Sequence, residues 1–140
     1  MIVEQRRHVE VRDLAEEVLQ RAELLDAADR ALIEQVLGKG VLPREVAVVT
    51  GVSTRCIQRR FRSLIQRLSD PKVLHIMRHR KQWDKLTADV ATGVWIKGWS
   101  LRHTASQLGV SLHRIRQRVQ TVRGILTAVD TPEPGARRAR

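Results

Sequence analysis

Apolar residues recur at helical spacing along most of this 140-residue chain. Two stretches show the same succession of 4, 3 and 4 residues between apolar positions, which places those side chains on one face of a helix. They are Ile57, Phe61, Leu64 and Leu68 in the first stretch, and Ile115, Val119, Val122 and Leu126 in the second. Aromatic residues make up only 3% of the chain, which does not favour strands. The pattern predicts an all-α protein.

An amphipathic segment precedes the first stripe. Its apolar positions are Val11, Leu14, Val18, Ala22 and Leu25, and its acidic residues Asp13, Glu16, Glu17 and Glu23 fall outside that stripe. We predict one N-terminal amphipathic helix within residues 1–25. We expect its apolar stripe to pack on the unit that follows, and pairing with a second chain remains the alternative.

The chain also contains an internal repeat with an offset of 58 residues. Residues 39–68 read KGVLPREVAVVTGVSTRCIQRRFRSLIQRL, and residues 97–126 read KGWSLRHTASQLGVSLHRIRQRVQTVRGIL. Ten of the 30 aligned positions are identical. The identities are Lys39/Lys97, Gly40/Gly98, Arg44/Arg102, Ala47/Ala105, Gly51/Gly109, Val52/Val110, Ser53/Ser111, Ile57/Ile115, Arg60/Arg118 and Leu68/Leu126. We therefore expect two copies of one structural unit.

Residues that start and stop helices divide the first copy into three helices. Asp26 can cap a helix that reaches about residue 37, where Gly38 and Gly40 end it. Pro43 suits the first turn of a second, short helix that reaches about residue 49.

A turn then leads into the third helix of the copy. Gly51 can adopt the left-handed conformation, Val52 is expected to point inward, and Ser53 can cap the helix that carries the first apolar stripe. The second copy predicts the same three helices at about 85–97, 101–107 and 112–127. The expected domains are a first unit over 26–70, a connecting helix at about 72–83 with the second unit inside 71–129, and a disordered basic tail over 130–140.

A short helix, a Gly-Val-Ser turn and a basic helix resemble the helix-turn-helix of DNA-binding proteins. Apolar residues fall four, seven and eleven places after Ile57 and again after Ile115. This spacing is similar to that of LuxR-type response regulators and of region 4 of bacterial sigma factors. The repressor-type variant fits less well, because Arg60 and Arg118 occupy a place that is commonly apolar there. The resemblance implies two tandem helix-turn-helix units that bind DNA through their third helices, as in the paired DNA-binding segments of some transposases.

The charge of the chain strengthens this interpretation. The formal net charge is +11, and residues 46–140 carry 19 Lys and Arg against 5 Asp and Glu. A basic protein of this kind is typical of a polyanion partner, which we expect to be double-stranded DNA. One cysteine excludes an intrachain disulfide, and no apolar run is long enough to span a membrane. We expect a cytoplasmic, nucleoid-associated protein without a membrane partner.

The exposed faces of the two third helices supply the candidate DNA contacts. No acidic residue occurs from Ser53 to Ser69 or from Ser111 to Val129, whereas a merely solvated helix normally mixes charges. Arg pairs with guanine and Gln with adenine in the major groove. The residues expected to contact bases are Arg55, Gln58, Arg59, His113, Arg114, Arg116 and Gln117. Those expected to contact phosphates are Arg44, Arg62, Arg102 and Arg123.

Other residue types point to structure rather than to chemistry. His75 and His79 have metal-like spacing, but the flanking cations and the lack of nearby carboxylates argue against a metal site. Cys56 is interpreted as a small residue of the groove face, and the three Trp as core residues. No cluster of carboxylates or phosphate-binding loop indicates catalysis. We expect no enzyme activity, metal or cofactor.

The sequence therefore predicts a sequence-specific DNA-binding protein that regulates transcription, of bacterial, phage or plasmid origin. Two alternatives stay open. One is the DNA-binding component of a recombination, transposition or phage packaging complex. The other is an adaptor whose acidic N-terminal helix contacts RNA polymerase or another protein. The chain could act as a monomer or a homodimer.

Overall fold

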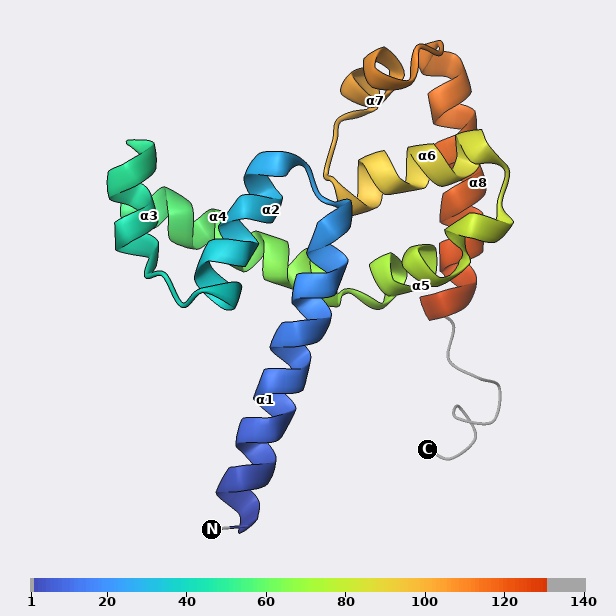
Figure 1. Ribbon diagram of the computed structural model, residues 1–140. Helices are drawn as coiled ribbons and strands as arrows, with labels where there is room; N and C mark the ends of the chain where they lie inside the picture. Colours follow the sequence, from blue (N-terminus) through green and yellow to red (C-terminus); the bar gives the residue numbers. More distant parts are fainter. Residues whose placement is uncertain (1, 131–140) are drawn as a thin grey trace. The chain divides into compact units, whose positions relative to one another are not determined.

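The computed structural model describes the backbone of residues 2–130 and the side chains of residues 12–129. Every regular element in this part of the chain is helical, so the fold is all-α as predicted (Figure 1). The chain divides into two compact units, residues 1–69 and residues 70–140. The predicted tail after residue 130 lies outside the described residues, and residue 130 itself ends a helix.

The described part of each unit contains four α-helices. Those of unit 1 are α1 (Ile2–Arg21), α2 (Ala27–Ile33), α3 (Pro43–Thr50) and α4 (Thr54–Ser69). Those of unit 2 are α5 (Pro71–His79), α6 (Lys85–Ala91), α7 (Leu101–Leu108) and α8 (Leu112–Asp130). Single 3-10 turns follow α1 and α5 at Ala22–Leu24 and Arg80–Gln82, and π-helical turns extend α2 and α6 through Glu34–Gly38 and Thr92–Ile96.

The structural repeat is longer than the repeat visible in the sequence. Both 3-10 turns, both π-helical turns, α2 and α6, and α3 and α7 have bounds that differ by 58 residues. The last residues of α1 and α5, Arg21 and His79, are also 58 apart, and the buried Val18 of α1 corresponds to the buried Ile76 of α5. The N-terminal helix and the connecting helix are therefore equivalent first helices, not additions to a three-helix unit.

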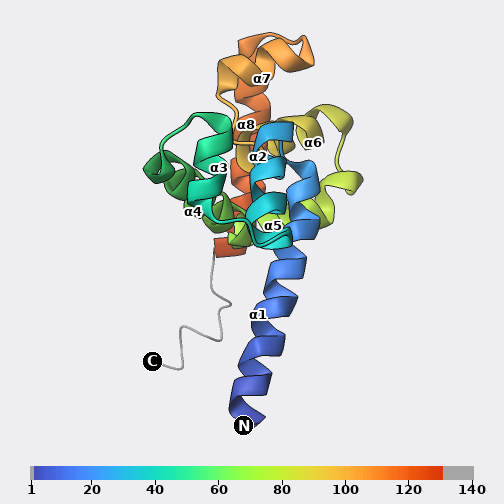
Figure 2. The same cartoon turned by 60° about the vertical axis from the view of Figure 1, so that its left-hand side comes forward.

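The last helix of each unit packs against the other three. In unit 1, α4 lies against α1, α2 and α3, and in unit 2, α8 lies against α5, α6 and α7 (Figures 1 and 2). The predicted apolar stripes are the buried faces of these helices, except that Phe61 is only half-buried. The unit 1 core is Val18, Ala22, Leu25, Leu32, Ile33, Ala47, Ile57, Leu64 and Leu68. The unit 2 core is Val73, Ile76, Val90, Ala91, Ile96, Ile115, Val119, Val122 and Leu126.

The turn before the last helix has the predicted geometry in both units. Gly51 has φ 74° and Gly109 has φ 66°, a left-handed conformation that other residues adopt at a cost. The hydroxyl of Ser53 accepts a hydrogen bond from the backbone N–H of Cys56 at 3.2 Å, and Ser111 accepts one from Arg114 at 3.3 Å. These bonds satisfy amides of the first helical turn that have no partner within the helix.

Four details of the prediction were wrong. Asp26 precedes α2, but its side chain makes no capping hydrogen bond, unlike the equivalent Asp84. Leu14 was expected in the buried stripe of α1 but is 59% exposed. The amino-terminal half of α1 extends beyond the other helices of unit 1, so no helix of the unit covers it (Figure 1). Val52 is 39% exposed rather than pointing inward, because it lies in the turn between α3 and α4 and not on a helix face that packs on the core. The connecting helix ends at His79, before the single 3-10 turn of residues 80–82. The side chain of Val11 lies outside the described ones.

Candidate nucleic-acid interface

The exposed face of α4 carries a line of arginines. Arg55, Arg59 and Arg62 follow one another at spacings of 4 and 3 residues, so they share one face of the helix, opposite the buried stripe. All three are exposed, and so is Gln58, which lies at the flank of this face. The predicted phosphate contact Arg62 therefore lies in line with two predicted base contacts.

The corresponding face of α8 is polar but carries less charge along its centre. His113, Gln117 and Gln120 occupy the positions equivalent to the three arginines of α4. Arg114 and Arg116 flank them on either side, and all five residues are exposed. The two units thus present the same helix face with different chemistry.

The remaining predicted phosphate contacts come from three helices. Arg44 and Arg102 are equivalent positions in the first turns of α3 and α7, and Arg123 lies on α8. All three are exposed. Arg44 and Arg102 thus add a cation from the preceding helix of each unit, so the basic residues of a unit are not confined to its last helix.

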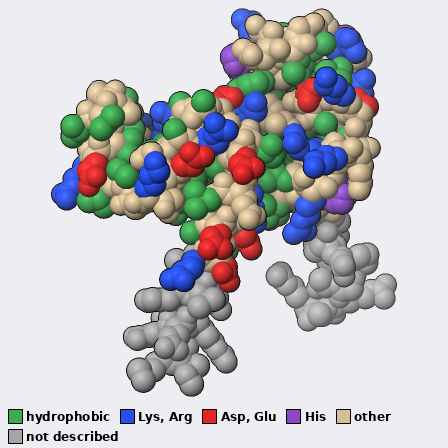
Figure 3. All heavy atoms as spheres, viewed as in Figure 1, with side chains coloured by type: hydrophobic (Ala, Val, Ile, Leu, Met, Phe, Trp, Pro, Cys, Tyr) green, Lys and Arg blue, Asp and Glu red, His purple; other side chains and the backbone are tan. Residues whose placement is uncertain are grey.

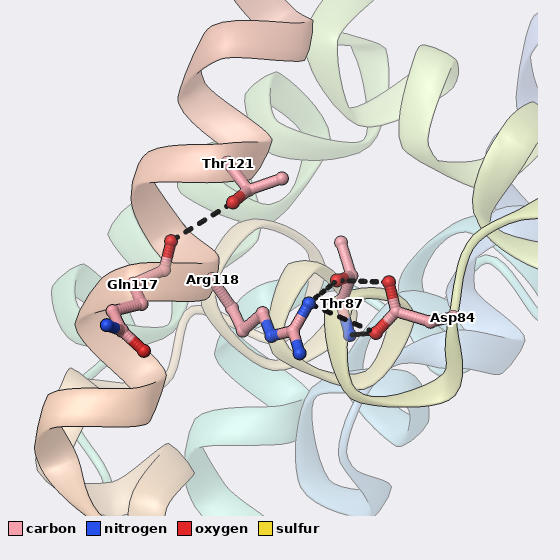
Figure 4. A network of polar contacts seen from close by, with 5 residues as sticks. All are labelled: Asp84, Thr87, Gln117, Arg118 and Thr121. Atoms are coloured by element: carbon pink, nitrogen blue, oxygen red, sulfur yellow. Dashed lines mark hydrogen bonds and ion pairs between the residues drawn. The ribbon is translucent and has the colours of Figure 1, made fainter.

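One arginine of each last helix is used inside its own unit. Arg60 of α4 contacts the carboxylate of Asp29 in α2 at 2.6 Å. Arg118 of α8 donates to the hydroxyl of Thr87 at 3.3 Å and lies 3.4 Å from a carboxylate oxygen of Asp84 (Figure 4). These arginines were singled out in the sequence only because they disfavour one helix-turn-helix variant. Within the last helices, theirs is the basic position that is identical in both copies, and this was the available signal that they act within the fold.

Figure 4 shows how adjacent residues of α8 have different roles. The side chain of Arg118 points towards the start of α6, whereas that of Gln117 points away from it. Asp84 caps α6 by accepting hydrogen bonds from the N–H and the hydroxyl of Thr87, at 3.2 and 2.8 Å. These bonds, with a smaller effect from Arg118, lower the pKa of Asp84 below its ordinary value of 3.8.

Charge is distributed unevenly within unit 1. The acidic residues Asp13, Glu16, Glu17 and Glu23 are exposed on the first helix and the turn after it, where Figure 3 shows acidic side chains together. The helix α4 has no acidic residue at all. Within unit 1, the described side chains of α4 therefore carry positive charge without any negative charge, whereas those of α1 carry both.

The other candidate groups have structural surroundings. The rings of His75 and His79 lie 4.3 Å apart, and partial burial, followed by the charges of His79 and Arg78, lowers the pKa of His75. In the described part of the chain, no group of three or more His, Cys, Asp or Glu side chains is placed to hold a metal ion. Cys56 is an exposed free thiol.

The tryptophans pack only partly into the core. Trp83, Trp95 and Trp99 are half-buried, and Trp95 contacts the cluster around Val90 and Ile115. Trp99 packs on Gly93, and its ring makes an edge contact with His103 and a cation–π contact with Lys97. The expected core role thus holds in part for these residues.

An apolar surface on α3 was not predicted from the sequence. Val48 and Val49 are 83% and 87% exposed, and Figure 3 shows hydrophobic side chains reaching the surface over this helix. Their equivalents in α7 are the polar Ser106 and Gln107. A comparison of the two copies position by position would have revealed this difference.

Comparison with protein-family models, with curated proteins and with solved structures finds no match to the chain. Among the described residues, no helix combines the length and the apolar character needed to cross a membrane. Any functional conclusion must therefore come from the geometry and charge of the two units.

Proposed function

We propose that this protein binds double-stranded DNA sequence-specifically and regulates transcription, with α4 and α8 as the recognition helices of two tandem helix-turn-helix units. The observation that carries the proposal is the repeated exposed helix face without acidic residues, at the same place in two units. A solvated helix gains stability from mixed charges, so two basic faces without acids are better explained by a polyanion partner.

The turn geometry supports the same proposal. Gly51 and Gly109 allow a sharp change of direction between a short helix and a long one, and Ser53 and Ser111 cap the long one. An α-helix presented in this way fits the major groove of B-DNA. Arg60 connects α4 to α2, and Arg118 connects α8 to α6. These contacts help to fix the orientation of the exposed faces of α4 and α8 within their own units.

The two recognition faces are expected to read different half-sites. Arginines at the centre of the α4 face suit guanine edges and phosphates, whereas Gln117 and Gln120 on α8 suit adenine. A single chain should therefore prefer an asymmetric site. Because both helices belong to one chain, the two half-sites should lie near each other on one duplex.

The test is selection of bound sequences from a random DNA pool by the full chain, followed by footprinting. The variant Arg55→Ala/Arg59→Ala should lose protection over one half-site, and Arg116→Ala/Gln117→Ala over the other. A matched control is Arg78→Ala/Lys81→Ala, which removes two exposed cations outside α4 and α8 and should preserve the footprint. Failure to enrich any sequence, or equal losses in all three variants, would contradict the proposal.

An adaptor function is the second candidate, and α1 favours it. The exposed Leu14 and the acidic residues around it give α1 a surface that is suited to a protein rather than to DNA. Capture of RNA polymerase by the full chain, abolished by Leu14→Asp without loss of DNA binding, would support this function. Sedimentation of the protein alone distinguishes this function from a homodimer, because only a dimer would sediment as twice the mass of the chain.

A further inference from the structure

Unit 1 contains an apolar cavity of about 530 Å³ between α2, α3 and α4, and this cavity is open to solvent. Its floor is formed by the buried Leu32 and Ile57, and its walls by Val41, Val46 and Val49. A cavity of this volume and lining is typical of a site for a small molecule. A small helical unit normally fills such a space with its own side chains.

Unit 2 fills the equivalent space with its own side chains. Ala28 and Thr50 of the cavity are both exposed, and their equivalents are Leu86 and Leu108. Both leucines are half-buried and pack on the cluster that contains Val90. Two small residues of unit 1 thus replace two large apolar residues of unit 2.

A third exchange concerns an aromatic ring. Val41 lines the cavity where unit 2 has Trp99. In unit 2, carbon Cε3 of the Trp99 ring lies only 2.8 Å from the position that a Cβ atom would take at Gly93, so the ring rests directly on the helix backbone. The equivalent of Gly93 in unit 1 is Gln35, another lining residue. The chemistry that this space accepts is therefore an indole and branched alkyl groups.

The polar residues at the cavity do not call for a charged ligand. Two ionisable side chains line the cavity. The guanidinium of Arg60 pairs with the carboxylate of Asp29 at 2.6 Å, and Glu45 is exposed, so its carboxylate can stay in water when an apolar molecule binds. The remaining lining is dominated by aliphatic side chains.

We infer that unit 1 binds a small, uncharged, apolar molecule of about the size of a bicyclic aromatic, in the space that unit 2 fills with Leu86, Trp99 and Leu108. The bound molecule takes the place of the missing side chains and packs α3 against α2 and α4. This inference goes beyond the proposed DNA binding and does not depend on it.

The test uses indole as the probe, because indole is the side chain of Trp99. The full chain, with labelled methyl groups, is titrated with indole and followed by NMR. Saturable shifts are expected for the methyl signals of Val41, Val46 and Ile57. The methyl signals of unit 2, such as those of Val90 and Ile115, serve as the internal control and should not move.

Two variants make the test specific. Ala28→Leu/Thr50→Leu gives unit 1 the residues of unit 2, and it should weaken indole binding at least tenfold while raising the melting temperature of unit 1. Val48→Ser is the matched control, since Val48 is exposed on the same helix but does not line the cavity. It should leave indole binding unchanged. If the double variant does not fold, Val41→Trp fills the same space and carries the same expectation.

Three results would overturn the inference. The first is the absence of saturable shifts up to the solubility limit of indole. The second is equal binding by the filled and the unfilled protein. The third is concentration-dependent dimerisation that Val49→Ser abolishes, which would mean that a second chain covers the cavity at this lining residue. None of these readouts involves DNA, so the failure of this inference and that of the proposed function can be told apart.

Discussion

Neighbouring arginines of α4 differ in what they contact, although the sequence presents them as one basic run. Arg59 is exposed on the outer face, whereas Arg60 contacts the carboxylate of Asp29. Their matched substitutions separate a role in binding from a role in folding.

We expect Arg59→Ala to cost about 1–3 kcal/mol of binding free energy on the preferred DNA site, the range for one bidentate base contact. Its free energy of unfolding should not change. Arg60→Ala should instead lower the free energy of unfolding by less than about 1 kcal/mol, because the pair is partly exposed. DNA titration and urea unfolding of both variants check this. Equal losses of DNA affinity would show that Arg59 has no special role.

Acid should affect unit 2 through the cap of α6. The pKa of Asp84 is lowered in the folded protein by the hydrogen bonds from Thr87, so the unfolded chain binds this proton more tightly. The stabilisation by Asp84 is therefore complete above pH 3.8 and is lost as the pH falls through the lower pKa of the folded state. Asp84→Asn should lower stability at pH 7 and flatten this acid dependence. Urea unfolding at several pH values measures both effects, with Asp89→Asn as a control of equal charge.

At the scale of single residues, the sequence predicted local backbone features, such as caps and left-handed turns, better than it predicted contacts between distant side chains. Ser53, Ser111, Gly51 and Gly109 behave as expected, because caps and left-handed turns depend on residues only a few places away. The partner of Arg60 lies 31 residues away in the chain, and a local pattern contains no information about it. The contact between bases and Arg55 or Gln117 remains a prediction.

At the scale of elements, replacing Gly109 in the turn before α8 and replacing Gly124 within α8 should change the free energy of unfolding in opposite directions. Gly109 has φ 66° and open space around the position of a Cβ atom, so Gly109→Ala should cost only backbone strain, about 1–2 kcal/mol of unfolding free energy. Gly124 lies inside α8 and also has open space, so Gly124→Ala should stabilise the protein by roughly 0.5–1 kcal/mol. Thermal and urea unfolding measure both, and the same sign for both variants would contradict the turn geometry.

The equivalence of α1 and α5 shows why the sequence revealed only part of the fold. The aligned segments that form these helices retain little identity, and what persists is a buried apolar residue such as Val18 or Ile76. Packing requires apolar character and volume rather than a particular residue. The turns kept identical residues, because their glycines and serines have few substitutes.

At the scale of the whole molecule, each unit has its own core, so unfolding should not be a single two-state step. All three tryptophans lie in unit 2, and the cavity lies in unit 1. Intrinsic fluorescence therefore reports unit 2 alone, whereas circular dichroism reports both units. We expect circular dichroism to show an earlier transition that fluorescence lacks. Coincident curves from the two methods would mean that the units unfold together.

The ion pairs of Arg60 and Arg118 show how an interaction can persist in both copies of a duplicated unit although its acidic partner differs. In unit 1 the acid is Asp29, the equivalent of Thr87, and in unit 2 it is Asp84, the equivalent of Asp26. Both units have an aspartate at the position of Asp26 and Asp84, but the arginine of unit 1 pairs with the second acid, three residues further along the helix. Both positions lie at the amino end of a helix, where a carboxylate is favoured by the helix dipole. Either acid could be lost during divergence once the other was present, so the interaction can outlast the residue pair that first made it.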